Sequence, residues 1–447
     1  MAHYRFGEQI VSSDQVGFEK LLESFYGIQE AERPVCLCKE PGGPMYIACV
    51  AGKHILKRMP NTGSLHTLDC DSYEPLDMYS GQGDLEGTAI NHNQDGTVSL
   101  KFDFPLTLRS GKTPPAASAS EGSSIKKRTK GLTLRGYLDC LWVEAELNRW
   151  HPGMYGKRGW RVVHRLLTNA AVVQQTKGNP LSEVLYVPEP YKPNDKDAIE
   201  ARLLARIRPF SQSPRNARKL MIVIGEYKEF RPAARGQMLI LRHVPHYPFL
   251  IEEQIYSKLK EKYKWALDLL DMTSQNNNAG HLMIAATVSI SEVQIASVEE
   301  IALQFYDEHW LPIDNVFELK MASLLVERNR SFLKFLRLNR DRREPMPLFQ
   351  LLDTEEPFNI YIDNDSREEY QRELLRWLNG EKSQYGVWRT DSGVFPTLPP
   401  KRSQHARQPL SETAEQAKHR SIIDARKFEK ETPVEESQPE EPAVVVN

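Results

Sequence analysis

Four side chains near the amino terminus have the types and spacing of a metal site. Cys36 and Cys38 are two residues apart, and His66 and Cys70 are four residues apart. Three thiolates and one imidazole make a complete tetrahedral ligand set for Zn²⁺. Residues two apart on an extended strand point to the same side, and residues four apart on a short helix capped by Ser64 would share one face. The sequence therefore predicts a closed structural zinc site, because four protein ligands leave no open position for a substrate.

Two further residues are alternative ligands. His54 begins a predicted strand and could take the place of His66. Cys49 follows Met45 and Ile47 at strand spacing, which indicates that it faces the core. Without a metal, the same pattern would be buried thiols beside a surface histidine. The residues alone leave these alternatives open.

Two basic segments are candidates for nucleic-acid binding. The first lies on or beside a helix predicted over 158–171, and the second lies within one predicted over 317–338. Each mixes bases with apolar residues, which is typical of a helix with one face on the core and another on a phosphate backbone. A solvated basic face would show the same pattern, and Glu327, Asp341 and Glu344 dilute the charge of the second segment. The predicted nucleic-acid contacts are Lys157, Arg158, Arg161, Arg165, Arg330, Lys334, Arg337 and Arg340.

A third segment is typical of a metal-dependent nuclease. An apolar run leads into Glu226 and Lys228, and a carboxylate and a lysine two apart on a strand would face one cleft. The mechanism also needs an aspartate on a neighbouring strand, and the candidates Asp195 and Asp197 lie in a loop-like stretch. A buried strand that emerges into charged residues explains the pattern more simply. The nuclease is therefore the alternative prediction and not the first.

The elements that must position these residues follow from hydrophobic spacing and turn residues. Helices are predicted over 15–26, 132–148, 158–171, 252–270, 298–308, 317–338 and 367–378. Strands are predicted over 35–39, 45–50, 54–59, 88–91, 98–104, 220–224, 238–242, 282–288, 348–352 and 359–362. The predicted fold class is α+β, with a small zinc-stapled β-rich amino-terminal domain, a mixed α/β domain with long helices, and a disordered tail. The predicted boundaries are 1–110 for the β-rich domain, 111–127 for a linker, 128–395 for the α+β domain and 396–447 for the tail.

Composition narrows the function class. The 447 residues include 58 Lys and Arg against 60 Asp and Glu, so no global field favours nucleic acid. The five cysteines are an odd number, which argues for free thiols or metal rather than a disulfide framework. No signal peptide and no bilayer-length apolar run is visible, so we expect a cytoplasmic protein without a membrane partner. The motifs of serine hydrolases, P-loop NTPases and dinucleotide-binding folds are absent from the sequence.

The chain also resembles an uncharacterised bacterial family, catalogued as domain of unknown function eleven-seventy-three. The resemblance covers roughly residues 10–395 and is carried by Val35-Cys-Leu-Cys-Lys, Pro44-Met-Tyr-Ile-Ala, Leu56-Lys-Arg-Met-Pro-Asn-Thr-Gly63, His66-x3-Cys70, Tyr73-Glu-Pro, Trp310-Leu-Pro and Arg330-Ser-Phe-Leu-Lys. It implies that the three amino-terminal cysteines of that family fall on Cys36, Cys38 and Cys70. It also implies a setting on integrative and conjugative elements. It supplies no activity.

The first functional prediction is a non-enzymatic zinc-binding protein of mobile-element type that binds DNA, RNA or a nucleoprotein partner. One alternative is the metal-dependent nuclease with Glu226 and Lys228. The other is a structural adaptor whose basic helices contact acidic protein partners. The sequence does not indicate an oligomeric state.

Overall fold

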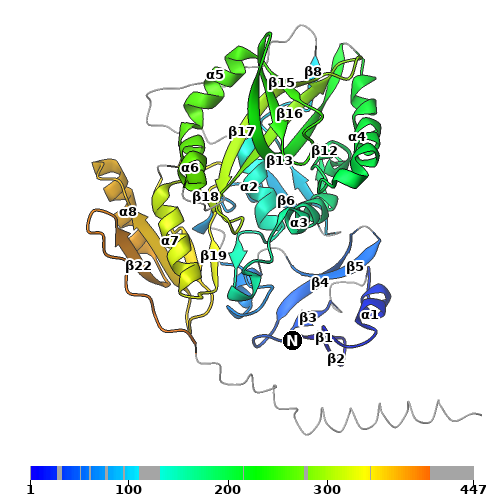
Figure 1. Cartoon of the computed structure of the whole chain (residues 1–447). Coiled ribbons are helices and arrows are strands. Elements are labelled where there is room, and N and C mark those ends of the chain that lie inside the picture. The colour runs from blue at the N-terminus through cyan, green and yellow to red at the C-terminus, as the bar shows by residue number, and fades with distance from the viewer. Residues whose placement is uncertain are drawn as a thin grey trace, which may run out of the picture. The chain divides into compact units, whose positions relative to one another are not determined.

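Four β-sheets and eight α-helices are present in the part of the chain that the computed structural model describes (Figure 1). The described residues are 2–27, 33–50, 52–59, 62–75, 79–93, 96–109, 131–214, 216–275, 280–342 and 344–402. The linker predicted over 111–127 lies outside them, as does the predicted tail from residue 403. Residues 1–401 form one compact unit.

The amino-terminal sheet carries Cys36, the first of the candidate metal ligands. Its strand order is β2 (Gln9–Ser12), β1 (His3–Phe6), β3 (Val35–Cys36), β4 (Gly43–Val50) and β5 (Lys53–Arg58). Helix α1 (Phe18–Ser24) packs against β5, and Leu22 of the helix forms a small core with Phe6, Val11 and Ile47 of β1, β2 and β4. The predicted strands over 45–50 and 54–59 are confirmed as β4 and β5.

The second sheet joins segments from both sides of the predicted linker. Its order is β11 (Asn179–Pro180), β10 (Gln174–Thr176), β7 (Val98–Leu100) and β6 (Ile90–His92). Strand β8 (Thr107–Arg109) likewise pairs with the much later β13. The predicted boundary between residues 110 and 128 therefore runs through two sheets.

The largest sheet surrounds the long strand β13. Its path is β12 (Leu185–Tyr186), β13 (Ala217–Ala233), β14 (Gly236–Leu241), β15 (Phe249–Ile251), β17 (Ala296–Tyr306) and β16 (His281–Ile290), with β18 (Pro312–Ile313) on β17. Strand β13 pairs with β16 through its first half and with β14 through its second half, so the path of strands closes on itself. Helices α2 (Leu134–Glu144), α4 (Lys196–Ser211), α5 (Glu253–Lys262) and α6 (Lys264–Gln275) contact strands of this sheet. This cover explains the continuous apolar run of β13, which is buried from Leu220 to Glu226.

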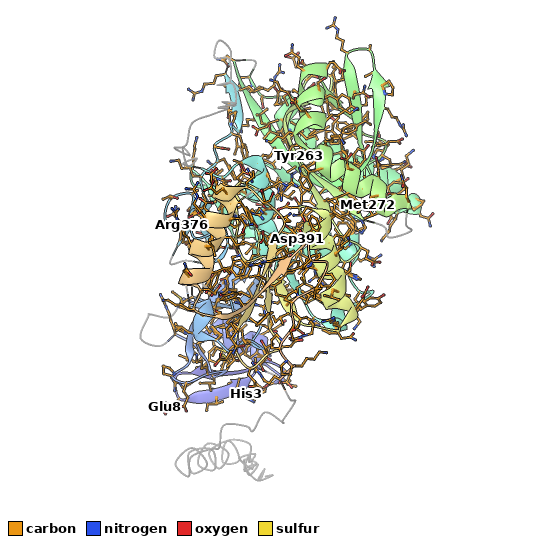
Figure 2. All side chains as sticks on the ribbon, turned by 90° about the vertical axis from the view of Figure 1, so that its left-hand side faces the viewer. His3, Glu8, Tyr263, Met272, Arg376 and Asp391 are labelled. Carbon is orange, nitrogen blue, oxygen red and sulfur yellow. The ribbon has the colours of Figure 1, made fainter. Side chains whose placement is uncertain are left out.

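The carboxyl-terminal sheet also mixes distant segments. Its order is β22 (Gln384–Arg389), β21 (Phe358–Asp363), β20 (Phe349–Leu351), β19 (Phe332–Lys334) and β9 (Arg149–Trp150). The remaining helices are α3 (Trp160–Val172), α7 (Val316–Glu327) and α8 (Glu368–Gly380). The hydroxyl of Tyr73 donates to Gln350 Oε1 at 2.8 Å, and both side chains are buried, so the amino-terminal loop is anchored on β20. The dense side-chain packing of the described residues is visible in Figure 2.

Three predicted helices differ from the structure. The helix predicted over 298–308 is wrong, because this segment is strand β17, whose ladder with the ten-residue strand β16 outweighs local helical spacing. The helix predicted over 317–338 ends at Glu327, since Asn329 adopts φ +53° and the chain continues into β19. The helix over 252–270 is divided at Tyr263 into α5 and α6. Conversely, α4 was not predicted, and Asp197 lies in its first turn rather than in a loop.

Candidate metal centre

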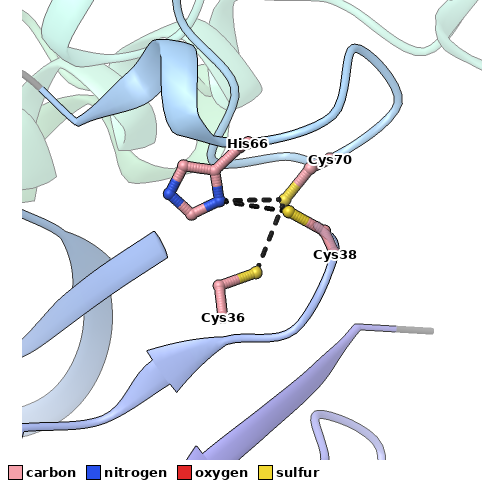
Figure 3. A group of neighbouring side chains, drawn as sticks. All are labelled: Cys36, Cys38, His66 and Cys70. Atoms are coloured by element: carbon pink, nitrogen blue, oxygen red, sulfur yellow. Dashed lines mark hydrogen bonds between the residues drawn. The ribbon is translucent and has the colours of Figure 1, made fainter. Parts of the chain in front are cut away.

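The four predicted ligands converge in the structure (Figure 3). Their ligand atoms all lie within 4.8 Å of one another, and this Cys₃His group could hold a metal ion. The sulfur atoms of Cys36 and Cys70 are 3.8 Å apart. The Nδ1 atom of His66 lies 3.4 Å from the Cys38 sulfur and 3.6 Å from the Cys70 sulfur. Cys36, His66 and Cys70 are buried, whereas Cys38 is partly exposed.

Short-range pairing positions Cys36 and the loop that follows it. Strand β3 lies between β1 and β4, where Cys36 is opposite Tyr4 on one side and Gly43 on the other. The His66 ring lies over Gly43, and a Cβ atom on this glycine would come within 2.5 Å of His66 Cε1. A residue without a side chain is therefore required where the imidazole crosses β4.

The second half of the site is a pair of turns and not the predicted helix. The 3₁₀-helix η2 (Gly63–Leu65) ends before His66, which is extended, and its N-cap is Thr62, so Ser64 lies inside it and does not cap it. The amide of Cys70 then donates to Thr67 O at 2.9 Å, closing a turn that brings the thiol back toward the imidazole. An ion pair between Glu74 and Arg58 holds the following loop to β5. The four-residue spacing is thus satisfied by turn geometry rather than by one helical face.

The electrostatics of the cluster favour a bound cation. Hydrogen bonds from Cys36 and Cys70 lower the pKa of the Cys38 thiol well below its ordinary value, which favours its thiolate form. The hydrogen bond to Cys38, together with Cys70 and burial, raises the pKa of the Cys36 thiol. Three thiols this close cannot all ionise unless a positive charge lies among them, because like charges raise each other's pKa. A divalent metal supplies that charge.

The two alternative ligands lie outside the cluster. Cys49 is opposite His54 in the ladder of β4 and β5 and is exposed, so the prediction that it faces the core is wrong. The small core that contains Ile47 does not extend as far along β4 as Cys49. His54 instead packs against Tyr26 in a tilted arrangement, with ring centroids 4.7 Å apart. The structure therefore favours His66 over His54.

The first basic segment presents an exposed face. Lys157, Arg161 and Arg165 are exposed, the last two on helix α3. Arg158 is different, because it is largely enclosed and donates to the backbone carbonyls of Leu147 and Arg149. Three of the four predicted contacts in this segment are thus accessible.

The second basic segment is mostly interior, and the expectation of an exposed basic helix there was wrong. Arg330 pairs with Asp353 at 2.7 Å, and Lys334 pairs with Glu318 at 3.1 Å. The two remaining bases are paired as well, Arg337 with Asp314 at 3.2 Å and Arg340 with Asp84 at 2.8 Å. The side chains of Arg330, Lys334 and Arg337 are at most 7% exposed. These charges pair with carboxylates that are buried or partly buried, and they do not form an exposed basic surface.

The two candidate nuclease residues, Glu226 and Lys228, lie in different surroundings and do not face one cleft. Glu226 is buried, with Oε1 2.9 Å from both His281 Nδ1 and Arg242 Nε, and with Oε2 3.3 Å from His243 Nε2. Burial opposes ionisation of Glu226, but the hydrogen bonds from the two histidines and the charge of Arg242 outweigh it and lower the pKa to about 2. Lys228 is 45% exposed and points to Glu229 at 3.9 Å. The partners of Glu226 are imidazoles and a guanidinium rather than a second carboxylate.

Two aromatic rings complete this polar cluster. His281 stacks on Trp310 with centroids 3.8 Å apart, and His243 stacks on Trp160 with centroids 4.8 Å apart. Sequence reasoning missed both histidines. The available signal was their position, since one follows the strand predicted over 238–242 and the other precedes the strand predicted over 282–288.

Comparison with known proteins places the chain in a family. The family model described as "Protein of unknown function (DUF1173)" matches residues 4–391. The chain belongs to the DUF1173 family. The match includes all four residues of the Cys₃His cluster and every described sheet, and it confirms the resemblance stated above. No curated protein and no solved structure matches the chain.

The structure also bears on membrane association. Among the described residues, no helix combines the length and the apolar character needed to span a bilayer.

Proposed function

We propose that this DUF1173 protein is a non-enzymatic zinc protein in which one Zn²⁺ joins β3 to the loop after η2. The observation that carries the proposal is the spacing of the ligand atoms. A tetrahedral zinc ion, with Zn–S bonds of about 2.3 Å and Zn–N bonds of about 2.0–2.1 Å, holds its sulfurs about 3.8 Å apart and a sulfur and a nitrogen about 3.5 Å apart. The corresponding distances here are 3.8 Å for Cys36 to Cys70, and 3.4 and 3.6 Å for His66 to Cys38 and Cys70.

The chemistry of the donors supports zinc over other ions. Thiolates with one imidazole suit zinc, whereas magnesium and calcium take oxygen ligands. Four protein ligands close the site, so the ion would have a structural role. A structural zinc contributes its binding energy directly to folding.

We further propose that the metal organises a surface that binds nucleic acid. The loop after Cys70 contacts the segment leading to α3, because the Arg149 guanidinium donates to the backbone carbonyl of Tyr73. That segment and the helix carry the exposed bases Lys157, Arg161 and Arg165. Three exposed cations within nine residues suit a phosphate backbone. Such a role would fit the mobile-element setting that the family resemblance implies.

The metal is tested by elemental analysis of the untagged protein. We expect about one zinc per chain, because the four ligands form a single tetrahedral set. Cys36→Ser and His66→Ala should each lose the metal and unfold at lower temperature. Cys49→Ser is the matched control, because Cys49 is an exposed cysteine outside the cluster. Metal that survives both ligand substitutions would overturn the proposed site.

Nucleic-acid binding is tested by the salt dependence of affinity for duplex DNA and RNA. The double variant Arg161→Gln, Arg165→Gln should weaken binding and reduce the log–log salt slope by about two units, since each phosphate contact contributes nearly one. Arg202→Gln with Arg231→Gln is the control, because it removes the same charge from exposed arginines that pair with Glu189 and Glu229. Absence of binding at low salt would reject this half of the proposal and favour the adaptor function.

A further inference from the structure

A cavity of about 520 Å³ lies far along the chain from the metal ligands and is enclosed by segments of the carboxyl-terminal half. It is bounded by the end of α5, the Asn315 cap of α7, the connection between β19 and β20, the end of β21, and α8. Its volume is in the range that holds a small organic ligand. Met346, Leu348 and Ile362 form an apolar part of its wall, and Arg337 and Arg342 form a cationic part.

A chain of charged side chains lies behind the cationic wall. Arg135 contacts Asp139 at 3.2 Å and Asp314 at 3.0 Å. Arg337 contacts Asp314 at 3.2 Å and Glu318 at 3.9 Å. Lys334 completes the network through Glu318, and the Arg342 guanidinium donates to the carbonyl of Asp314.

This network has an excess of positive charge. Its buried part is balanced, with Arg135, Lys334 and Arg337 against Asp139, Asp314 and Glu318. Arg342 is exposed and adds one further positive charge on the open side of the wall. This additional guanidinium favours an anion in the cavity.

The lining also includes two acidic residues, Asp341 and Asp365. Asp365 pairs with Arg367, and the charge of Asp341 also acts on Arg367. With Lys262, Arg337 and Arg342 the lining has three cations against these two carboxylates, so its net charge is +1.

Arg342 is held in a defined orientation. Its guanidinium carbon lies 3.7 Å from the centre of the Trp265 ring, a cation–π contact that leaves the N–H groups on the guanidinium edge for hydrogen bonds. A guanidinium edge of this kind matches phosphate and carboxylate oxygens bidentately.

We propose that this cavity binds a small organic anion. Its phosphate or carboxylate group would lie against Arg342 and Arg337, and its apolar part would lie against Met346, Leu348 and Ile362. The site shares no residue with the metal centre or with the basic face of α3. The proposal of an anion site can therefore be tested without either of those proposals being correct.

The test uses the full chain and measures binding of adenosine monophosphate, benzoate and uncharged adenosine by calorimetry at constant ionic strength. We expect millimolar or tighter binding of at least one of the two anions and weaker binding of adenosine. Preference for one anion decides between phosphate and carboxylate. Equal binding of adenosine and its monophosphate, or no binding of either anion, would overturn the proposal.

Arg342→Gln provides the residue-level test. Because Arg342 lies on the open side of the cavity while Arg337 is buried, this substitution keeps the interior ion pairs. We expect a loss of affinity for the anion of about ten-fold, the size of one charge-assisted contact. The control Arg231→Gln removes an exposed arginine on β13 and should bind as the wild type does. Unchanged affinity in Arg342→Gln would overturn the assignment.

Discussion

The Lys334 ammonium lies 3.1 Å from the Glu318 carboxylate, and the two side chains are 2% and 0% exposed. This ion pair joins β19 to α7 inside the molecule. Two charges in such surroundings are tolerated because each compensates the other.

Removing one member of this pair should lower the stability of the folded protein. Lys334→Met leaves the charge of Glu318 without its nearest cation, and we expect the free energy of unfolding to fall by about 3–5 kcal/mol. Urea denaturation measures the change. Lys264→Met, which breaks the exposed pair with Asp268, is the matched control and should cost no more than about 1 kcal/mol. Similar losses in the two variants would contradict a distinct role for the buried pair.

The glycine beneath the imidazole gives a second prediction. In Gly43→Ala the new methyl group would collide with His66, and the ring must move away from the three sulfurs. We expect metal affinity to fall about ten-fold or more, the effect typical of misplacing a ligand. Competition with a chromophoric chelator measures it. Gly380→Ala is the control, because a Cβ atom there meets nothing within 4 Å. Equal affinities would show that the ring adapts without cost.

Glu226 should make the protein sensitive to acid. Its pKa in the folded chain is about 2, below the ordinary value of 4.5. A lowered carboxyl pKa stabilises the folded state above pH 4.5, and this contribution is lost as the pH falls toward 2. The difference corresponds to about 3 kcal/mol. Glu226→Gln should therefore be less stable than the wild type at pH 7, and the gap should narrow in acid when unfolding is followed against pH. A gap independent of pH would contradict this interpretation.

Asp307 should change the stability of the fold with pH in the opposite direction to Glu226. Its carboxylate accepts hydrogen bonds from the amides of His309 and Leu311, but burial is the larger effect and raises its pKa to about 7. The folded state thus favours the protonated form, and stability falls as the pH rises from 3.8 to about 7. Asp307→Asn keeps the acceptor oxygen and removes the titration. At pH 8 we expect it to be more stable than the wild type by up to about 4 kcal/mol in thermal or urea unfolding. If the free energy of unfolding falls by the same amount with rising pH in both proteins, another group must cause the effect.

The metal cluster could be predicted from the sequence because its information is local. A spacing of two residues in an extended segment and a spacing of four residues in a turn each allow few geometries, and all four residues are of the types that bind zinc. The turn that replaced the predicted helix after Leu65 did not change this outcome. Either geometry returns Cys70 to the side of His66.

The basic segment around Lys334 shows that the local sequence does not reveal which charges are paired in the folded chain. Its counter-charges are Asp84, Asp314, Glu318 and Asp353, which come from three separate parts of the chain. Charge density along the sequence therefore could not distinguish an exposed footprint from a compensated interior. Strand β17 was missed for a different reason, because its partner β16 is the preceding strand and the two form an antiparallel hairpin that begins at Ile290 and Ala296.

The tie between Tyr73 and Gln350 has a consequence for the order of events during synthesis. The four metal ligands are complete once residue 70 has left the ribosome, so the ion can be captured early. Tyr73 must wait until nearly 280 further residues have been made before its hydroxyl meets the Gln350 side chain. Strands β7 and β8 likewise precede their partners β10 and β13. With the proposed zinc bound, a nascent chain would thus complete its metal loop long before the rest of the molecule closes around it.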